Sequence, residues 1–108
     1  MKKQPPSYKP ETCPVSRFVA ILGDDWSWLI IREAFRGASK FSDFQKSTGI
    51  AKNILTDRMK KLTEHGIFER RDVGATGPRF EYFLSEKGKS LEPLLRNIIG
   101  WSRENLNH

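Results

Sequence analysis

The pattern of hydrophobic and polar positions predicts two helices near the start of the chain. Pro14 suits a first helical turn, and apolar residues then recur every three or four positions until Gly23 stops the segment. Residues 26–36 form the next segment, for which Asp24 or Asp25 can supply the cap. Because this segment is apolar on two nearly opposite sides, we expect a helix enclosed by other elements.

Two further helices follow, with a turn between them. A short helix over residues 43–48, capped by Ser42, ends at Gly49, and a longer one ends at Gly66. The longer helix has one apolar side, formed by Leu55, Met59 and Leu62. Two helices joined by a short turn that contains a glycine are typical of a helix-turn-helix motif.

Beyond residue 66 the pattern becomes that of β-strands. The stretches IFERRDV and RFEYFLS are rich in β-branched and aromatic residues, and the GATGP sequence between them favours a turn. We therefore expect a hairpin. Most aromatic side chains are expected to fill the core, namely Trp26, Trp28, Phe41, Phe44 and Phe80.

A last helical region starts at Ser85 and carries one broad apolar stripe. The stripe consists of Leu91, Leu94, Leu95, Ile98, Trp101 and Leu106. It is wider than the ~100° that packing on one neighbour requires, so we predict that it also joins two copies of the chain, aided by the first helix. The order of elements predicts an α+β, mostly α, fold. It is a winged helix-turn-helix domain over residues 13–108 with a C-terminal dimerisation helix, preceded by a flexible arm over residues 1–12.

Composition narrows the class of function. The chain of 108 residues has 19 lysines and arginines against 13 aspartates and glutamates, and its net charge of +6 favours a polyanionic partner. No apolar run approaches the ~20 residues that span a bilayer, and the N-terminus lacks the apolar core of a signal peptide. The single cysteine excludes an internal disulfide. We therefore expect a cytoplasmic protein whose partner is nucleic acid or an anionic membrane surface, and charge alone does not choose between them. A membrane-surface or RNA-binding domain would need a basic amphipathic helix or exposed aromatic platforms, and neither is evident in the sequence. The prediction is a protein that binds nucleic acid and does not associate with membranes.

Signals for catalysis and metal binding are missing from the sequence. His65 and His108 are far apart, and no second cysteine or carboxylate stands at ligand spacing. There is no phosphate-binding loop, nucleophile elbow or catalytic pair of carboxylates. We predict a protein that is not an enzyme and that uses no cofactor and no metal.

An ordered series of residues resembles one known family. The series runs through Cys13-Pro14-Val15, Gly23, Trp26, Leu29-Ile30-Ile31-Arg32-Glu33, Gly37, Phe41-Ser42-Asp43-Phe44, Leu55, Arg58, Met59, Leu62, His65-Gly66-Ile67, Arg79-Phe80-Glu81-Tyr82, Leu84-Ser85-Glu86-Lys87-Gly88 and Trp101. From residue 13 to about 103 it is similar to the HxlR-type winged-helix transcriptional regulators, relatives of the MarR group. The resemblance implies a homodimer that binds specific double-stranded DNA sequences. It also implies that a number of members sense electrophiles or oxidants through the cysteine of the Cys-Pro-Val motif.

Two positions depart from the family pattern. Asp25 stands where the family usually has a lysine, which changes the local charge and leaves the expected fold intact. Ala51-Lys52 replaces the Ser-Pro that usually begins the recognition helix, so the base preference of relatives cannot be transferred to this chain.

The recognition helix carries the residues expected to contact DNA. Opposite its apolar side lie Lys52, Asn53, Thr56, Asp57 and Lys60. Asparagine can bond adenine, lysine can reach guanine or phosphate, and threonine can touch a thymine methyl group. Arg58 lies at the edge of the buried side, where it can contact a phosphate or form an intramolecular ion pair. An ordinary solvated helix side remains the alternative interpretation.

The hairpin adds arginines to this surface. Arg79 lies beside the expected tip, where it can enter the minor groove or bind a phosphate. Arg70 and Arg71 alternate across a strand, so at most one of them is expected to face DNA. A plain solvated hairpin is the alternative.

Cys13 has two interpretations. At the start of a helix, before Pro14 and near Arg17, its thiolate would be stabilised and reactive. A lone cysteine is otherwise a small buried apolar residue. The prediction that results is a homodimeric DNA-binding regulator that acts as a repressor and responds to oxidants or electrophiles at Cys13. Control by a small hydrophobic ligand, or a winged-helix module that binds proteins, is the alternative.

Overall fold

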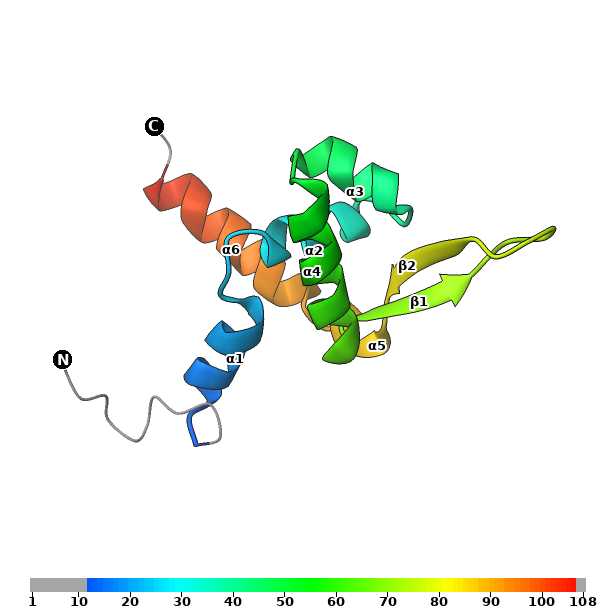
Figure 1. The fold of residues 1–108 in the computed structure, drawn as a ribbon. Helices are drawn as coiled ribbons and strands as arrows, with labels where there is room; N and C mark the ends of the chain where they lie inside the picture. The colour runs from blue at the N-terminus through cyan, green and yellow to red at the C-terminus, as the bar shows by residue number, and fades with distance from the viewer. Residues whose placement is uncertain (1–11, 107–108) are drawn as a thin grey trace.

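The computed structural model describes residues 12–106. Apart from Thr12, the arm predicted over residues 1–12 lies outside this range and stays a prediction. The elements follow in the order α1 (Pro14–Leu22), α2 (Ser27–Phe35), α3 (Phe41–Thr48), α4 (Lys52–Glu64), β1 (Phe68–Asp72), β2 (Phe80–Leu84), α5 (Glu86–Lys89) and α6 (Glu92–Asn105) (Figure 1). This order, mostly helical with one antiparallel pair of strands, confirms the predicted winged helix-turn-helix fold.

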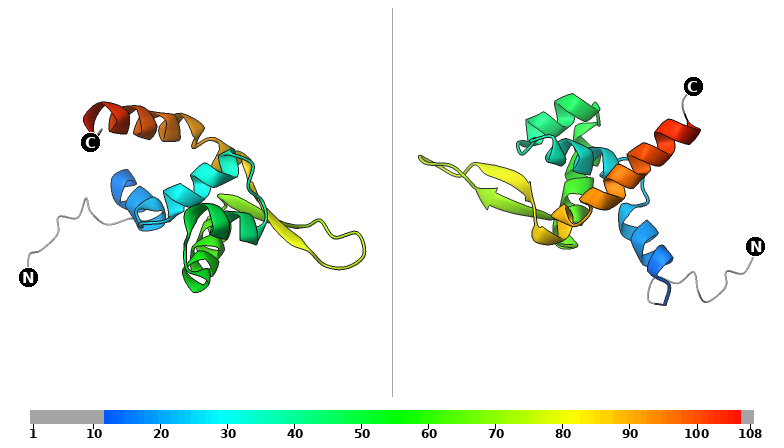
Figure 2. Two further views of the ribbon diagram at one scale, coloured as in Figure 1. Left: turned by 90° about the horizontal axis from the view of Figure 1, so that it is seen from above. Right: turned by 180° about the vertical axis from the view of Figure 1, so that it is seen from behind.

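The molecule has a wing at one end and two projecting helices at the other. The wing, residues 68–84, extends away from the helices (Figure 1). The helix α1 and the C-terminal end of α6 lie toward the opposite end in every view (Figure 2). The three helices α2, α3 and α4 lie between these ends. Surfaces at the two ends can therefore serve different purposes.

The core lies where α2, α3 and α4 meet the base of the wing. Ile30 and Ile31 of α2 are both fully buried, although adjacent residues point to different sides of a helix, so the prediction of an enclosed helix is confirmed. The predicted apolar side of α4 is confirmed too, since its three members are at most 1% exposed. The remaining core residues are Leu22, Phe44, Ile50, Ile67, Phe68 and Leu84.

The start of α3 differs from the prediction. The helix begins at Phe41, so Ser42 lies inside it and is not its cap. The carboxylate of Asp43 instead accepts hydrogen bonds from the backbone N–H groups of Lys40 at 3.2 Å and Ser39 at 3.5 Å. An acidic side chain at the third helical position can reach back in this way to N–H groups that have no partner within the helix.

The helical region predicted from Ser85 is divided into two helices. Ser85 caps α5, because its hydroxyl oxygen accepts a hydrogen bond from the backbone N–H of Gly88 at 3.0 Å. Pro93 lies in the first turn of α6. Since proline has no N–H to donate, a continuous helix would lose a backbone hydrogen bond here, and the chain starts a new helix instead.

The wing is tied to the helix-turn-helix by Ser39. The backbone carbonyl of Ser39, in the loop between α2 and α3, accepts a hydrogen bond from the N–H of Tyr82 at 2.8 Å. Its hydroxyl donates to the carboxylate of Glu81 at 2.7 Å, and Glu81 is only 8% exposed. These two bonds to neighbouring residues of β2 hold the wing against the loop that precedes α3.

Candidate nucleic-acid interface

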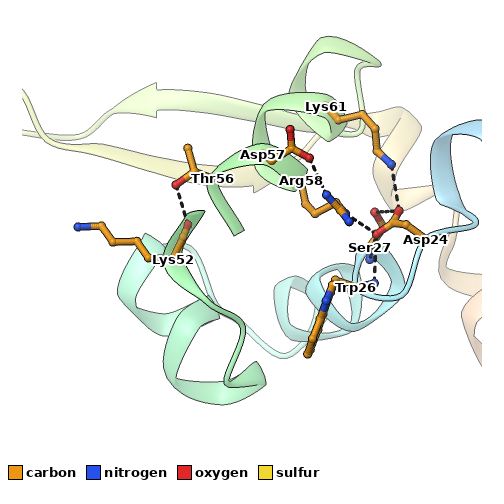
Figure 3. Close-up of polar contacts among 8 residues, drawn as sticks. All are labelled: Asp24, Trp26, Ser27, Lys52, Thr56, Asp57, Arg58 and Lys61. Carbon is orange, nitrogen blue, oxygen red and sulfur yellow. Dashed lines mark hydrogen bonds and ion pairs between the residues drawn. The ribbon is translucent and has the colours of Figure 1, made fainter. Parts of the chain in front are cut away.

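The exposed side of α4 carries the polar residues predicted from the sequence. The structure exposes Lys52, Asn53, Thr56, Asp57 and Lys60, opposite the buried leucines and methionine. Lys52 extends away from the protein, and the hydroxyl of Thr56 donates to the carbonyl of Lys52 at 2.9 Å (Figure 3). Because this bond engages the Thr56 hydroxyl hydrogen, what Thr56 can offer a ligand is its methyl group and an oxygen lone pair.

Arg58 is occupied by ion pairs within the protein. Its Nε lies 2.8 Å from Asp24 Oδ2, and its Nη1 lies 2.6 Å from Asp57 Oδ2. The side chain is 25% exposed, which places it at the edge of the buried side as expected. Of the two roles left open by the sequence, this geometry favours the intramolecular ion pair, and it sets Arg58 apart from the free cations of α4.

Asp24 joins the recognition helix to the start of α2. Its carboxylate accepts hydrogen bonds from the backbone N–H groups of Trp26 and Ser27, each at 3.1 Å, and from Lys61 Nζ at 3.0 Å (Figure 3). Partial burial would raise the pKa of Asp24, but the hydrogen bonds from Ser27, Lys61 and the other donors outweigh burial and hold this pKa far below its usual range. Trp26 occupies the N-cap position of α2, and of the two aspartates it is Asp24 that accepts from the N–H groups at the start of the helix.

The two neighbouring arginines of β1 lie on opposite faces of the wing. Arg70 pairs across the sheet with Tyr82, and the two share a cleft with residues of α4. Arg71 pairs with Glu81 and lies on the other face, beside Phe35 and Phe83. Only Arg70 is on the side of the recognition helix. The alternation of residues along a strand predicted that at most one of these arginines faces DNA, but it did not predict which one lies on the side of α4.

Phe80 corrects one expectation from the sequence. We expected it in the core, but it is 41% exposed. The guanidinium of Arg70 lies over its ring, 3.7 Å from the ring centre. Phe80 therefore supports a charged side chain on the wing surface and does not fill core volume.

The tip of the wing is ordered by Asp72. Its carboxylate accepts hydrogen bonds from the backbone N–H groups of Arg79 at 3.0 Å and Gly74 at 2.9 Å. These two bonds, with a smaller contribution from the charge of Arg70, lower the pKa of Asp72. The Arg79 side chain is 64% exposed and forms an ion pair with Glu81 at 3.6 Å, so its charge is partly neutralised.

Cys13 immediately precedes α1, with Pro14 as the first helical residue. The thiol is partly exposed and not bonded to another cysteine. Its pKa is lowered, first by the backbone N–H of Ser16, then by the Ser16 hydroxyl, and less by Val15 and the charge of Arg17. The position at the helix start is as predicted, and the surroundings favour the thiolate.

The predicted dimerisation stripe divides into a buried part and an exposed part. Leu95 is 9% exposed and Leu91 packs against the core, so these two are contacts within one chain. Leu94, Ile98 and Trp101 are 39%, 38% and 60% exposed. Two further apolar side chains project from α1, namely Val15 and Val19. We call this set the end surface: Val15, Val19, Leu94, Ile98 and Trp101.

Between residues 12 and 106 the structure contains no helix long and apolar enough to cross a membrane. Over the same range, no three histidine, cysteine, aspartate or glutamate side chains lie together as a metal site would require.

Comparison with known proteins identifies the family. The model of a family described as HxlR-like helix-turn-helix matches residues 21–108. The chain belongs to the HxlR-like family. The match extends from the end of α1 through the helix-turn-helix and wing to α6, so the resemblance inferred from the ordered residues is confirmed.

Relatives of this HxlR-like protein are transcriptional regulators. Mb3122 of Mycobacterium bovis, a helix-turn-helix-type transcriptional regulator, is 33% identical over 100 residues, or 93% of this chain and 63% of the relative. The chain thus spans under two thirds of that relative's length. The solved structure of PA1607, described as a candidate transcription factor, has a TM-score of 0.85 and 43% identity over 94% of this chain and 71% of its own. The redox regulator HypR in its reduced form has a TM-score of 0.78 and 26% identity, over 87% of this chain and 94% of HypR.

The chain therefore has the helix-turn-helix of the HxlR-like family, and the relatives that it matches are described as transcriptional regulators.

Proposed function

We propose that this HxlR-like protein is a homodimer that binds specific sequences of double-stranded DNA in the cytoplasm through α4 and the wing, and that it represses transcription. The observation that carries the proposal is the exposed polar side of α4, held beside a wing that carries three arginines, in a protein of net charge +6. A winged-helix module that binds proteins would instead present an apolar or acidic side on α4.

Within this interface the residues divide by their contacts. Asn53 is exposed on α4 and can bond the two edge atoms of adenine in the major groove. Lys52 and Lys60 are exposed cations for phosphate or guanine. Asp57 and Arg58 form an ion pair with each other at 2.6 Å, so we assign neither of them a base contact.

Replacing Asn53 should change which sequences are preferred. We expect Asn53→Ala to lower affinity for the preferred duplex by about 1–3 kcal/mol and to relax selection at one base pair. The preferred duplex is first selected from a random pool with the wild type. Binding is then titrated against that duplex, its single strands and a scrambled duplex at several salt concentrations.

Asn97→Ala is the matched control, because Asn97 is an exposed asparagine on α6, away from the wing. It should bind as the wild type does. Equal sequence preference in the Asn53 and Asn97 variants would contradict the assignment of Asn53. Wild-type binding that does not distinguish duplex from single strands would contradict the proposed function.

Oxidant sensing at Cys13 is a second function that specific observations favour. The thiol is partly exposed, and the Ser16 and Arg17 groups around it lower its pKa. HypR, similar in structure, is described as a redox regulator. Since the chain has one cysteine, oxidation can join the Cys13 thiols of two protomers in a disulfide. Each thiol loses one proton and one electron, and the oxidant takes up the two protons and two electrons.

The response should depend on the thiol alone. We expect diamide, which accepts two electrons and two protons as the disulfide forms, to change duplex affinity of the wild type and to leave Cys13→Ser unchanged. Non-reducing electrophoresis should show a crosslinked dimer only in the wild type. An unmodified Cys13 after treatment, with unchanged DNA binding, would return this residue to the structural interpretation.

A further inference from the structure

The wing and the recognition helix enclose a cleft between them. Residues of α4 line one wall, and Arg70 and Tyr82 of the wing line the other. On the α4 side, the residues are Thr56, Lys60, Thr63 and Glu64. Each wall thus carries one cationic residue, Lys60 on α4 and Arg70 on the wing. A cleft bordered by two cationic residues is suited to an anion.

Arg70 differs from the other arginines of the wing in its partners. Arg71 forms an ion pair with Glu69 at 2.8 Å, and Arg79 forms one with Glu81 at 3.6 Å. Within residues 12–106, no carboxylate lies within ion-pair distance of Arg70, whose defined contact is with the ring of Phe80. Its N–H groups are therefore available to an acceptor from outside the chain.

Phe80 gives this guanidinium, whose charge acts on Asp72 only from beyond ion-pair distance, a fixed position. A guanidinium stacked on an aromatic face keeps its N–H groups, which lie at the edge of the plane, open to a ligand. Holding the side chain before binding lowers the entropy cost of ordering it in a complex. This role also explains why a large aromatic residue stays 41% exposed on the wing.

The charges on the α4 wall locate the anion within the cleft. Lys60 lies one helical turn before Glu64, and both are exposed. The Glu64 carboxylate would repel an anion placed beside it, so the anion belongs at the Lys60 end. A bound DNA duplex that places its major groove against α4 brings backbone phosphates to the flank of the helix, where the wing lies.

We propose that Lys60 and Arg70 together bind one phosphate of the DNA backbone, with Arg70 held in place by Phe80. The inference rests on the proposed function, and it assigns the main phosphate contact of the wing to Arg70, ahead of the Arg79 expected from the sequence. Arg70 supplies two N–H groups to phosphate oxygens, and Lys60 adds a point charge. The contact carries no base information, so it should act equally on every duplex.

The test compares Arg70→Ala with Arg71→Ala, the same substitution at the neighbouring residue on the opposite face. Arg70→Ala should lower affinity roughly tenfold for preferred and scrambled duplexes alike and reduce the salt slope by about one. Arg71→Ala should keep the wild-type affinity and slope. Phe80→Leu keeps the charge of Arg70, so it should lower affinity roughly two- to fivefold with little change in slope.

A double variant tests whether one phosphate is shared. If Lys60 and Arg70 bind the same group, Lys60→Ala/Arg70→Ala should lose less affinity than the product of the two single losses. Thermal unfolding of each variant checks that the fold is retained. Wild type that binds no duplex would contradict the proposed function itself. Wild type that binds duplex, with Arg70→Ala unchanged or no different from Arg71→Ala, would overturn this inference alone.

Discussion

Replacing Asp24 with asparagine is expected to lower the free energy of unfolding by about 2–3 kcal/mol. An asparagine amide can still accept from the N–H groups at the start of α2, but it cannot form ion pairs with Arg58 and Lys61. Hydrogen bonds to charged groups contribute about 1.5–3 kcal/mol, and removing the Asp24 carboxylate leaves the partly buried Lys61 without its counter-charge and Arg58 paired with Asp57 alone. Urea denaturation measures the change.

Asp25→Asn is the matched control. Asp25 is the adjacent aspartate and is exposed, so the same change of charge should leave the midpoint of unfolding nearly unchanged. Equal midpoints for the two variants would show that the ion pairs to Asp24 contribute little.

The difference in stability between the wild type and Asp24→Asn should depend on pH. The pKa of Asp24 is lowered on folding, so its stabilising contribution is fully present above the unfolded value of about 3.9 and is lost as pH falls toward the folded pKa. The wild type should therefore lose stability more steeply than Asp24→Asn below about pH 4. The two stability curves should converge in acid. Parallel curves would mean that Asp24 is not the group responsible.

Asp24 also links two proposed functions of the molecule. The helix α1, which begins after Cys13, ends at Leu22, and Asp24 follows two residues later. The same carboxylate binds Arg58 and Lys61 on the recognition helix. In the proposed redox response, a displacement of α1 by a bond at Cys13 would act on the residue that holds α4 in place. Asp24→Asn should therefore lower the stability of the protein and also reduce the change in DNA affinity that diamide causes.

Sequence periodicity predicted the parts of the fold that depend on neighbouring residues. The buried side of α4, the order of elements and the hairpin follow from spacing that can be read along the chain. Asp24 and Arg58 are 34 residues apart, and no periodicity brings them together. Asp24 and Asp25 are equivalent candidates in the sequence, and what separates them is the set of bonds that Asp24 makes to the start of α2 and to α4.

In the wing, too, contacts between residues distant in sequence could not be predicted from periodicity. Alternation along β1 predicts that Arg70 and Arg71 point to opposite faces, but which face meets α4 is set by the packing of β1 against that helix. Phe80 was expected in the core because aromatic residues in strands are usually buried. Its exposure follows from its place beside the wing tip, beyond the reach of the helices. Such placements depend on contacts distant in sequence.

Trp101→Ala is expected to weaken dimerisation by about 2–4 kcal/mol, or roughly 30- to 1,000-fold in dissociation constant. Trp101 is the largest side chain of the end surface and is 60% exposed in one protomer, so its apolar area is available to a partner. Leu94, Ile98 and Trp101 lie on the same side of α6, because Ile98 follows Leu94 by four residues and Trp101 follows it by seven. Large aromatic residues at the centre of an interface contribute most of its binding energy.

Sedimentation velocity over a concentration series measures this effect, with Arg103→Ala as the control on the opposite side of α6. The control should remain as dimeric as the wild type. Because Trp101 makes few contacts within its own chain, the variant should keep its helical circular dichroism while the dimer dissociates. DNA affinity should then fall more steeply at low protein concentration, since two half-sites are bound together only by a dimer. A Trp101 variant as dimeric as the wild type at micromolar concentration would place the partner contact elsewhere than the end surface.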